Sequence, residues 1–311
     1  MTSPDTFDEV DPANMQINAV EGFHLGGTRY TVSFELSDDD EEFFRSYVLD
    51  VDMGASLTYT IRQQIEDTIM THASLSRDRH VVLEIGGLMH DLTPDGDSVT
   101  PLPEGTLRRL FHLDDGSQYV VGDDGVGYVR AEGGVWQLVP DPGDQPALRD
   151  IHGPNPNMIH ACGTGGTLLR LRGTAWEGGG SARDQREFTT LEVTAEGHIY
   201  LGGPEGLALA LRGDELIELT APENDFFSIR SFKGQRYWSD ANWGLNVQKG
   251  DSIVPLRELR HAFQMHASPE KLVIAGWKEI FVFDGENWDG FQLGYDGNIF
   301  LNRLDMADYG G

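Results

Sequence analysis

Histidine and cysteine are the residue types here best suited to catalysis or metal binding, and none occurs in a recognisable motif. The ten histidines are His24, His72, His80, His90, His112, His152, His160, His198, His261 and His266. No pair has the HExxH spacing or another close spacing typical of metal ligands. The chain has a single cysteine, Cys162, so a zinc or iron–sulfur site made of cysteines is excluded. The G-x-S-x-G motif that marks a serine nucleophile does not occur. We therefore predict no catalytic residue and no metal ligand.

Glycine-rich and acidic segments are the other places where a ligand could bind. Residues 162–166 (CGTGG) and 178–180 (GGG) do not match the phosphate-loop or dinucleotide fingerprints. The acidic run at residues 38–42 could supply carboxylate oxygens to a calcium ion. It lacks the glycine and the alternating spacing of a calcium loop, which favours a solvated acidic turn. The sequence therefore predicts no cofactor.

Five short loops between strand-like segments form a better candidate site, and they span residues 122–125, 162–166, 202–206, 240–244 and 276–279. Trp243 and Trp277 occupy nearly matching places in the last two loops. A tryptophan in a turn can anchor an interface, because it supplies a large apolar area and one hydrogen-bond donor. The same loops contain Asp123, Asp124, Glu205, Asp240 and Asn242. We predict that these residues form a binding surface, an acidic rim with an aromatic patch. The alternative is that both tryptophans pack against neighbouring repeats.

These loops belong to a repeat of about 38 residues. Copies begin at Gln118, Met158, His198, Arg236 and Lys271, with a weaker copy at His80, at spacings of 35–40 residues. Each copy contains two apolar strands joined by a polar turn, and another strand-like piece precedes most copies. Four short strands per repeat of about 40 residues are typical of a β-propeller blade. Because a lone blade cannot bury both faces, the blades are expected to pack in a closed ring.

The two ends of the chain supply further strands. Segments 28–36, 45–51, 56–61 and 297–304 are strand-like. We predict a single propeller domain over residues 1–311: a flexible acidic N-terminus (1–15), N-terminal strands and a closing blade (16–78), and repeated blades (79–311). Strands from both ends would complete a seventh blade and close the ring; six blades with an N-terminal extension is the alternative. Ile61, Ile65 and Ile69 predict one helix over residues 61–72.

The order of strands and tight glycine turns across roughly residues 70–292 resembles the WD-repeat family. The resemblance is architectural, because the one Trp-Asp dipeptide, Trp288–Asp289, stands at a different place in its unit. It implies a propeller and no particular subfamily. Propellers include both enzymes and binding scaffolds, so the resemblance implies no activity.

The charge balance limits the choice of partner. With 51 acidic and 23 basic residues, the formal net charge is −28, which repels nucleic acids and anionic membranes and attracts basic proteins. Residues 1–15 lack the features of a secretory signal, so we expect a cytoplasmic protein. Two functions fit: a non-catalytic binding propeller, such as an immunity protein that occludes a basic toxin, or a hydrolase or lyase acting on a sugar or lactone in the central channel. We favour the first, and the sequence leaves the oligomeric state open.

Overall fold

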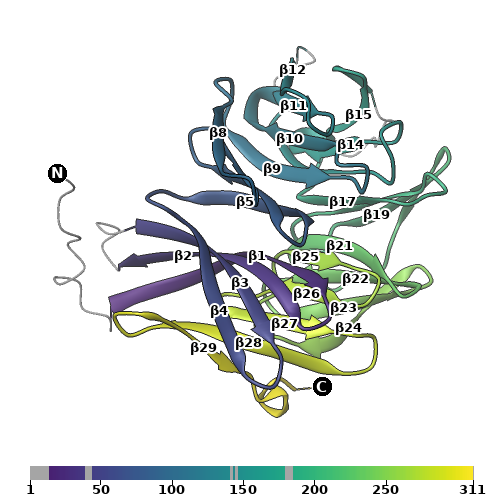
Figure 1. The fold of residues 1–311 in the computed structure, drawn as a ribbon. Helices are drawn as coiled ribbons and strands as arrows, with labels where there is room; N and C mark the ends of the chain where they lie inside the picture. The colour runs from purple at the N-terminus through teal and green to yellow at the C-terminus, as the bar shows by residue number, and fades with distance from the viewer. Residues whose placement is uncertain (1–13, 39–43, 141–142, 144–145, 179–184, 311) are drawn as a thin grey trace.

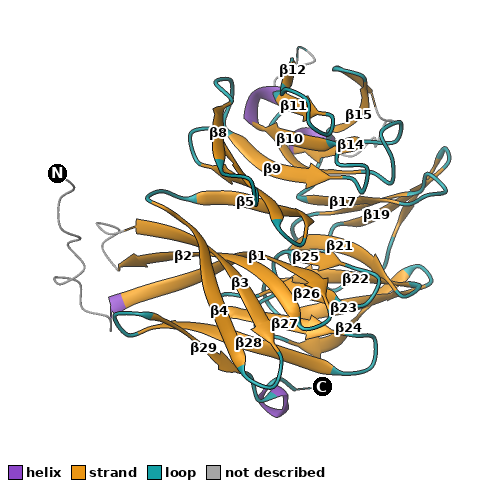
Figure 2. Cartoon of the chain, viewed as in Figure 1, coloured by secondary structure: helices purple, strands orange, loops and turns teal. Residues whose placement is uncertain are grey.

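The protein is a ring of seven antiparallel β-sheets, the blades of a propeller (Figure 1). The computed structural model describes residues 14–38, 44–140, 143, 146–178 and 185–310. Helix within these ranges consists of short 3₁₀ turns, among them η3 (Asp123–Gly125), η4 (Thr164–Gly166) and η5 (Met306–Asp308) (Figure 2). The all-β prediction and the choice of seven blades over six are therefore confirmed.

The first three blades follow one another along the chain. Blade 1 contains β1 (Met15–Gly26), β2 (Arg29–Asp38), β3 (Phe44–Met53) and β4 (Leu57–Ile65). Blade 2 contains β5 (Ile69–Ser76), β6 (Arg79–Glu84), β7 (Leu88–Leu92) and β8 (Ser98–Pro101). Blade 3 contains β9 (Leu107–His112), β10 (Gln118–Gly122), β11 (Gly127–Arg130) and β12 (Gln137–Val139).

The remaining four blades complete the ring. Blade 4 contains β13 (Leu148–His152), β14 (His160–Gly163), β15 (Leu168–Arg172) and β16 (Ala175–Gly178). Blade 5 contains β17 (Thr190–Val193), β18 (Ile199–Gly202), β19 (Ala208–Arg212) and β20 (Glu215–Glu218). Blade 6 contains β21 (Phe226–Phe232), β22 (Gln235–Asp240), β23 (Gly244–Lys249) and β24 (Ser252–Glu258). Blade 7 contains β25 (Met265–Ala267), β26 (Leu272–Ala275), β27 (Glu279–Phe283), β28 (Trp288–Tyr295) and β29 (Ile299–Arg303).

The first strand of each blade is the innermost one, and these seven strands contact one another around the whole ring. The second strands are the apolar segments that mark the repeat in the sequence. β10, β14, β18, β22 and β26 each occupy the second position of their sheet, and every described residue of β10, β18 and β26 is buried. The predicted equivalence of these five segments is therefore confirmed.

Glycine is required where a second strand ends against an inter-blade connection. A Cβ on Gly122 would lie 2.1 Å from the carbonyl oxygen of Thr106, and one on Gly163 would lie 2.0 Å from that of Ala147. No side chain fits at such distances. The same close approach therefore recurs in blades 3 and 4, which explains why glycine follows the apolar run in both copies of the repeat.

The ring closes where blade 1 meets blade 7, at opposite ends of the chain (Figure 1). The two blades share an apolar core that includes Phe34, Leu49 and Phe291. The Tyr59 hydroxyl donates to the carbonyl of Ile299, and Arg303 donates to the carbonyl of Met53 at 2.9 Å. The expected blade built from both ends is wrong, because N- and C-terminal strands lie in separate, adjacent sheets. N- and C-terminal strands still close the ring, through side chains and a few hydrogen bonds.

The helix predicted for residues 61–72 is also wrong. β4 continues to Ile65, and β5 begins at Ile69 after a short bend. Ile61 is 52 % exposed, whereas Ile65 and Ile69 are buried, so the three isoleucines share no face. Packing against neighbouring blades outweighed a weak helical pattern. Of the acidic run, only Asp38, the end of β2, lies in the described part of the chain. No helix within the described ranges has the length and apolarity needed to cross a membrane.

Two buried histidines lie near the contact between blades 1 and 2. The rings of His72 and His80 meet edge to face with centroids 5.5 Å apart, and none of their four nitrogens has a hydrogen-bond partner among the described residues. Nε2 of His80 is 3.7 Å from a carboxylate oxygen of Asp50. Burial, reinforced by Arg62, lowers the pKa of His80 to about 4.

Removing the last strand is expected to damage ring closure. Deletion of residues 297–311 takes away β29, which pairs with β28 and contacts β4, and leaves a bare strand edge that favours aggregation. We expect a lower yield of soluble protein and a lower Tm than for the full chain. Tyr59→Phe, which removes one hydroxyl, should cost only about 1 kcal/mol. A truncated chain with unchanged Tm would contradict this role for β29.

Acidification is expected to destabilise the fold through His80. Its pKa of about 4 in the folded chain lies below the ordinary 6.5, so between these pH values only the unfolded chain takes up the proton, and the free energy of unfolding falls as pH falls. The loss approaches ~3 kcal/mol at pH 4. Urea denaturation at pH 7 and pH 4.5 should show a smaller decline for His80→Phe than for wild type. His198→Phe, in the turn before β18, is the control and should keep the full decline.

Candidate functional site

The loops between second and third strands gather on one rim of the ring, beside the connections between blades. The backbone N–H of Asp123 donates to Thr106 at 2.8 Å, that of Thr164 to Ala147 at 3.0 Å, and that of Phe226 to Gly203 at 3.1 Å. Each of these hydrogen bonds joins a loop between second and third strands to the start of a first strand, either in the same blade or in the next one. The five loops predicted from the sequence therefore share one rim, which we call the loop rim.

Trp243 and Trp277 project from adjacent blades on the loop rim. Trp243 is 41 % exposed and Trp277 is 55 % exposed, so neither side chain is buried in an inter-blade core. The Trp277 ring lies 4.3 Å from the ring of His261, centroid to centroid. His261 in turn hydrogen-bonds through Nδ1 to the carbonyl of Ala241 at 2.7 Å, in the loop that carries Trp243. The two tryptophan loops are thus linked through one imidazole.

A cleft of about 700 Å³ lies beside Trp277, where blade 7 meets the start of blade 1. Aromatic and cationic side chains contribute to its walls, including Arg260, Lys278, Tyr295 and Phe300. All four lysines of the chain, Lys233, Lys249, Lys271 and Lys278, lie in blades 6 and 7. Of these lysines only Lys278 stands in a second-to-third-strand loop, so Lys278 and Arg260 supply the positive charge of the aromatic part of the loop rim.

Asp240 does not belong to the exposed surface, contrary to its predicted role as a contact residue. It is fully buried. Its carboxylate accepts backbone N–H groups of Asn242 and Trp243 at 2.8 and 2.6 Å, and the Asn246 amide at 2.5 Å. Asn242 itself is exposed. Asp240 is thus a positioning residue that fixes the turn on which Trp243 stands.

The other three predicted acids, Asp123, Asp124 and Glu205, lie on other blades than the tryptophans. Asp123, in blade 3, is paired with Arg108 at 2.6 Å and with Arg149 at 3.3 Å, and the hydrogen bonds from Arg108 lower its pKa. Asp124 and Glu205 are exposed, at positive φ of 58° and 55°, and neither forms an ion pair within the described ranges. The loop rim therefore has an acidic arc over blades 3 to 5 and an aromatic arc over blades 6 and 7.

A second hollow opens at the opposite end of the ring. The sequence analysis placed the site of the alternative enzyme in the central channel but named none of the residues found here. This central cavity has a volume of about 560 Å³, and its mouth is formed by turns between first and second strands, such as residues 113–115 and 153–156. The first-to-second turn and the second-to-third loop of a blade lie at opposite ends of its second strand. The central cavity and the loop rim therefore face opposite ways.

Charged side chains from the innermost strands meet in this cavity. Arg109 of β9 pairs with Glu21 of β1 and with Asp150 of β13, at 3.3 Å in the second case. Glu21 also bonds His266 of β25. Burial alone would raise the pKa of Glu21, but Arg109 and His266 lower it to about 2. These ion pairs join blades that are distant in the sequence across the middle of the ring.

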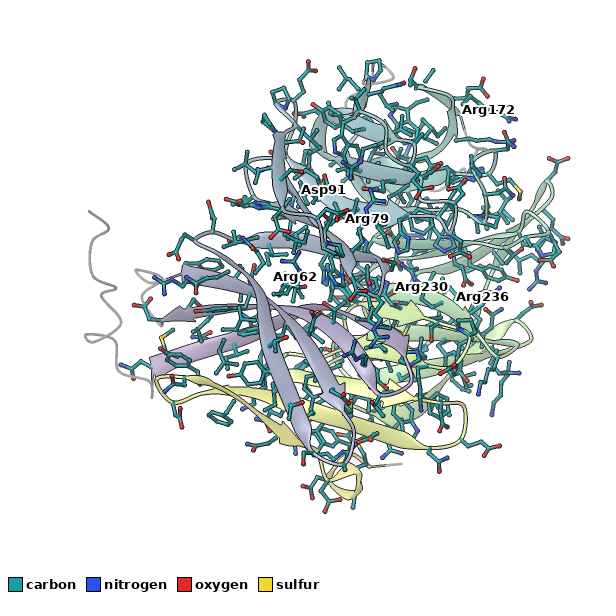
Figure 3. All side chains as sticks on the ribbon, viewed as in Figure 1. Arg62, Arg79, Asp91, Arg172, Arg230 and Arg236 are labelled. Carbon is teal, nitrogen blue, oxygen red and sulfur yellow. The ribbon has the colours of Figure 1, made fainter. Side chains whose placement is uncertain are left out.

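The cavity also contains neutral imidazoles. Burial lowers the pKa of His152 well below its ordinary value, with help from Arg230 and Arg109, and burial lowers that of His266 to about 4. Figure 3 marks Arg230 towards the middle of the molecule. The signal in the sequence was a charged residue inside most of the first strands, as in LRRLFH and FFSIRSF, because buried strands rarely carry charge unless it is paired.

Metal binding and thiol chemistry find little support in the described residues. Within these ranges no group of three His, Cys, Asp or Glu side chains is arranged to hold a metal ion. Cys162 is buried in β14, and burial raises its pKa well above the ordinary value, which disfavours the reactive thiolate. The cavity is nevertheless rich in inward-facing histidines and carboxylates, a feature that the sequence analysis did not predict.

Comparison with known proteins gives a fold and one informative relative. No protein-family model matches the chain. It is 26 % identical over 225 residues to the immune protein Tsi7 of Pseudomonas aeruginosa, covering 65 % of this chain and 69 % of that protein. The WD40 propeller domain of Doa1 superposes with a TM-score of 0.72 at 10 % identity, over 88 % of this chain and 98 % of that domain.

Two other solved propellers are similar in fold. YCF48 bound to D1 peptide has a TM-score of 0.62 at 15 % identity, covering 88 % of this chain and 95 % of that one. Virginiamycin B lyase from Staphylococcus aureus has a TM-score of 0.62 at 10 % identity, covering 84 % and 95 %. At such identities the likeness extends to the fold alone. The chain is a seven-bladed β-propeller protein of WD-repeat-like architecture, without an assigned subfamily.

Proposed function

We propose that this propeller is a non-catalytic immunity protein that neutralises a protein toxin by binding it. The observation that carries the proposal is the 26 % identity to the immune protein Tsi7, which extends over about two thirds of both chains. A similarity of that extent spans several blades and is therefore more than a shared repeat pattern. The solved complex of YCF48 with a D1 peptide supports a protein ligand, since it shows that this fold can hold a peptide.

The aromatic arc of the loop rim is the proposed contact surface. Trp243 and Trp277 stand in adjacent blades and are about half exposed, and Trp277 borders a cleft of about 700 Å³. Asp240 and His261 hold the two loops in place. Preorganised aromatic side chains lose little conformational freedom on binding, and such residues dominate the energetics of many interfaces.

A basic toxin surface fits the overall charge. The formal net charge of −28 attracts positively charged proteins over long range, and Asp124 and Glu205 are exposed on the same rim. The proposal places the protein in the cytoplasm, where it would meet a toxin that acts there. Arg260 and Lys278, at the cleft beside Trp277, call for an acidic or neutral spot on the toxin.

An enzyme acting on a sugar or lactone is the second candidate, and the central cavity is the observation that favours it. Its histidines and carboxylates are the residue types of acid–base catalysis, and lyases occur among structures with the same fold. Against it, the carboxylates are engaged in ion pairs with arginines. Incubation with a panel of sugar glycosides and lactones should show no turnover above buffer; turnover lost in Glu192→Gln would favour the enzyme.

Removing both tryptophan anchors is expected to abolish protection. The protein encoded beside this gene is expressed as the candidate toxin in a bacterial host, with or without this chain. Wild type should restore growth. The double substitution Trp243→Ser and Trp277→Ser should weaken binding in calorimetry by about 30-fold for each anchor, and by roughly 1,000-fold if the two losses add, because each hot spot contributes about 2 kcal/mol. It should fail to protect.

Val135→Ser is the matched control, because Val135 is 77 % exposed but lies between β11 and β12, away from the loop rim. It should bind and protect as wild type does. Unchanged binding by the double variant would show that the tryptophans are not the contact surface. A candidate toxin that neither arrests growth nor binds this chain would contradict the immunity role for that pair.

Neutralising the acidic arc should change association more than dissociation. Asp124→Asn and Glu205→Gln together remove two exposed charges. Both residues have a positive φ, a conformation that asparagine tolerates well. We expect slower association at low salt and a weaker salt dependence, with little change in the dissociation rate. Stopped-flow kinetics against the toxin at several salt concentrations measures both rates. Glu215→Gln, on the outer strand β20, is the control; an equal effect there would mean that only total charge matters.

A further inference from the structure

The central cavity contains a buried guanidinium that lacks a carboxylate partner. Arg230 of β21 is only 7 % exposed, and its NH1 donates to the carbonyl of Ile229 at 2.6 Å. Among the described residues, no carboxylate oxygen lies within 4.0 Å of its nitrogens. Burial lowers its pKa. A buried guanidinium with no carboxylate in direct contact can take an anionic ligand.

The nearby carboxylates are engaged elsewhere. Glu21 bonds Arg109 and His266. Asp150 bonds Arg109 and the backbone N–H of Leu191, the latter at 3.0 Å. Glu192 bonds Arg236 at 2.7 Å, as well as Ser231 of the same strand as Arg230. Arg230 is therefore the one arginine of this buried cluster with no carboxylate in direct contact.

A second donor faces the cavity beside Arg230. Nδ1 of His152 accepts the backbone N–H of Val193 at 3.1 Å, so in the neutral ring the proton sits on Nε2. The low pKa of His152, to which Arg230 contributes, keeps the ring neutral. His152 lines the cavity, and within the described ranges its Nε2–H has no acceptor. The guanidinium and this N–H together can hold the two oxygens of one anion.

The charge of the site selects a monoanion. Arg109, Arg230 and Arg236 balance Glu21, Asp150 and Glu192, as three positive charges against three negative ones. Because these six charges already sum to zero, a bound monoanion adds one net negative charge and a dianion such as phosphate adds two, so the dianion costs more. Asp114 and Asp115, exposed at the mouth, further disfavour polyanions. A single carboxylate is therefore preferred to a polyanion, and it can pair with the guanidinium of Arg230.

The walls of the cavity are aromatic. Phe23 stacks on His266 with ring centroids 3.8 Å apart, and the Phe111 ring lies 4.9 Å from that of His152. Flat rings at these places offer apolar contact to a ligand body. We propose that the central cavity binds one carboxylate group on an aromatic or apolar carrier, with Arg230 and His152 as the groups that hold its oxygens. The site lies opposite the loop rim, so it does not depend on the proposed toxin.

Benzoate and benzamide are a matched pair of probes, because they differ in charge at almost constant shape. Each is titrated into the full chain in 0.15 M salt by calorimetry, and the Tm is recorded at saturation. We expect benzoate to bind and to raise the Tm, and benzamide to bind at least 10-fold more weakly. Equal binding of the two, or stronger binding of inorganic phosphate than of benzoate, overturns the proposal.

Variants locate the site. Arg230→Lys keeps the charge and should weaken benzoate binding several-fold, and Arg230→Gln should weaken it at least 10-fold. Arg212→Gln, which breaks a pair with Asp251 on the outside of the ring, should bind like wild type. If Arg230→Gln does not fold, NMR of wild type decides: benzoate must shift the ring protons of His152 and His266, and shifts confined to other residues overturn the assignment.

Two further probes distinguish the source of the carboxylate. The peptide acetyl-Gly-Gly-Phe is compared with the same peptide amidated at its C-terminus. If the peptide with a free C-terminal carboxylate binds and benzoate does not, the ligand is the C-terminus of a chain. If benzoate binds and the peptide does not, the ligand is a small acid. Either result agrees with a carboxylate site. If neither benzoate nor the free-acid peptide binds in the millimolar range, the proposal is wrong.

Discussion

The architecture depends on one constraint: a four-stranded sheet of this size has two apolar faces and must cover both. Each blade here covers its faces only with its two neighbours, as in the core formed by Tyr119, Val121, Ile151 and Ile159 between blades 3 and 4. The same requirement forces blade 1 onto blade 7. Since the chain does not interleave its ends in one sheet, closure relies on the shared apolar core and on few hydrogen bonds. Cooperativity of the ring therefore rests on side-chain packing at that junction.

The seven innermost strands bury charged side chains near the axis of the ring, and these side chains form ion pairs between blades. Near the axis the seven first strands converge, and polar and charged side chains of these strands are buried there. Glu21, Arg109 and Asp150 form an ion-paired chain from blade to blade. Such buried pairs add less to stability than apolar packing of equal volume, but they fix the order of the blades and leave a polar hollow at one end.

The sequence predicted those parts of the fold that repeat. Five second strands were placed correctly because each is a short apolar run that ends at a turn, and Trp243 and Trp277 were recognised as exposed because polar residues flank them. The helix at residues 61–72 failed because isoleucines four residues apart occur by chance in two strands joined by a bend. Asp240 was misplaced because sequence does not distinguish a carboxylate that caps a turn from one that faces solvent. The residues of the central cavity were not identified because bonded partners there lie 41, 88 and 245 positions apart along the chain, and only the ring brings them together.

The distribution of lysine has a practical consequence. The four lysines all lie in blades 6 and 7, and Lys278 directly follows Trp277. Apart from the α-amino group, amine-directed reagents can modify the ring only on that side. A chain coupled through its amines to a sensor chip would therefore be held by the blades that carry both tryptophans, with its acidic arc turned outward. Immobilisation through a single engineered cysteine on blade 3, in a chain whose own Cys162 is buried, would present the aromatic arc instead.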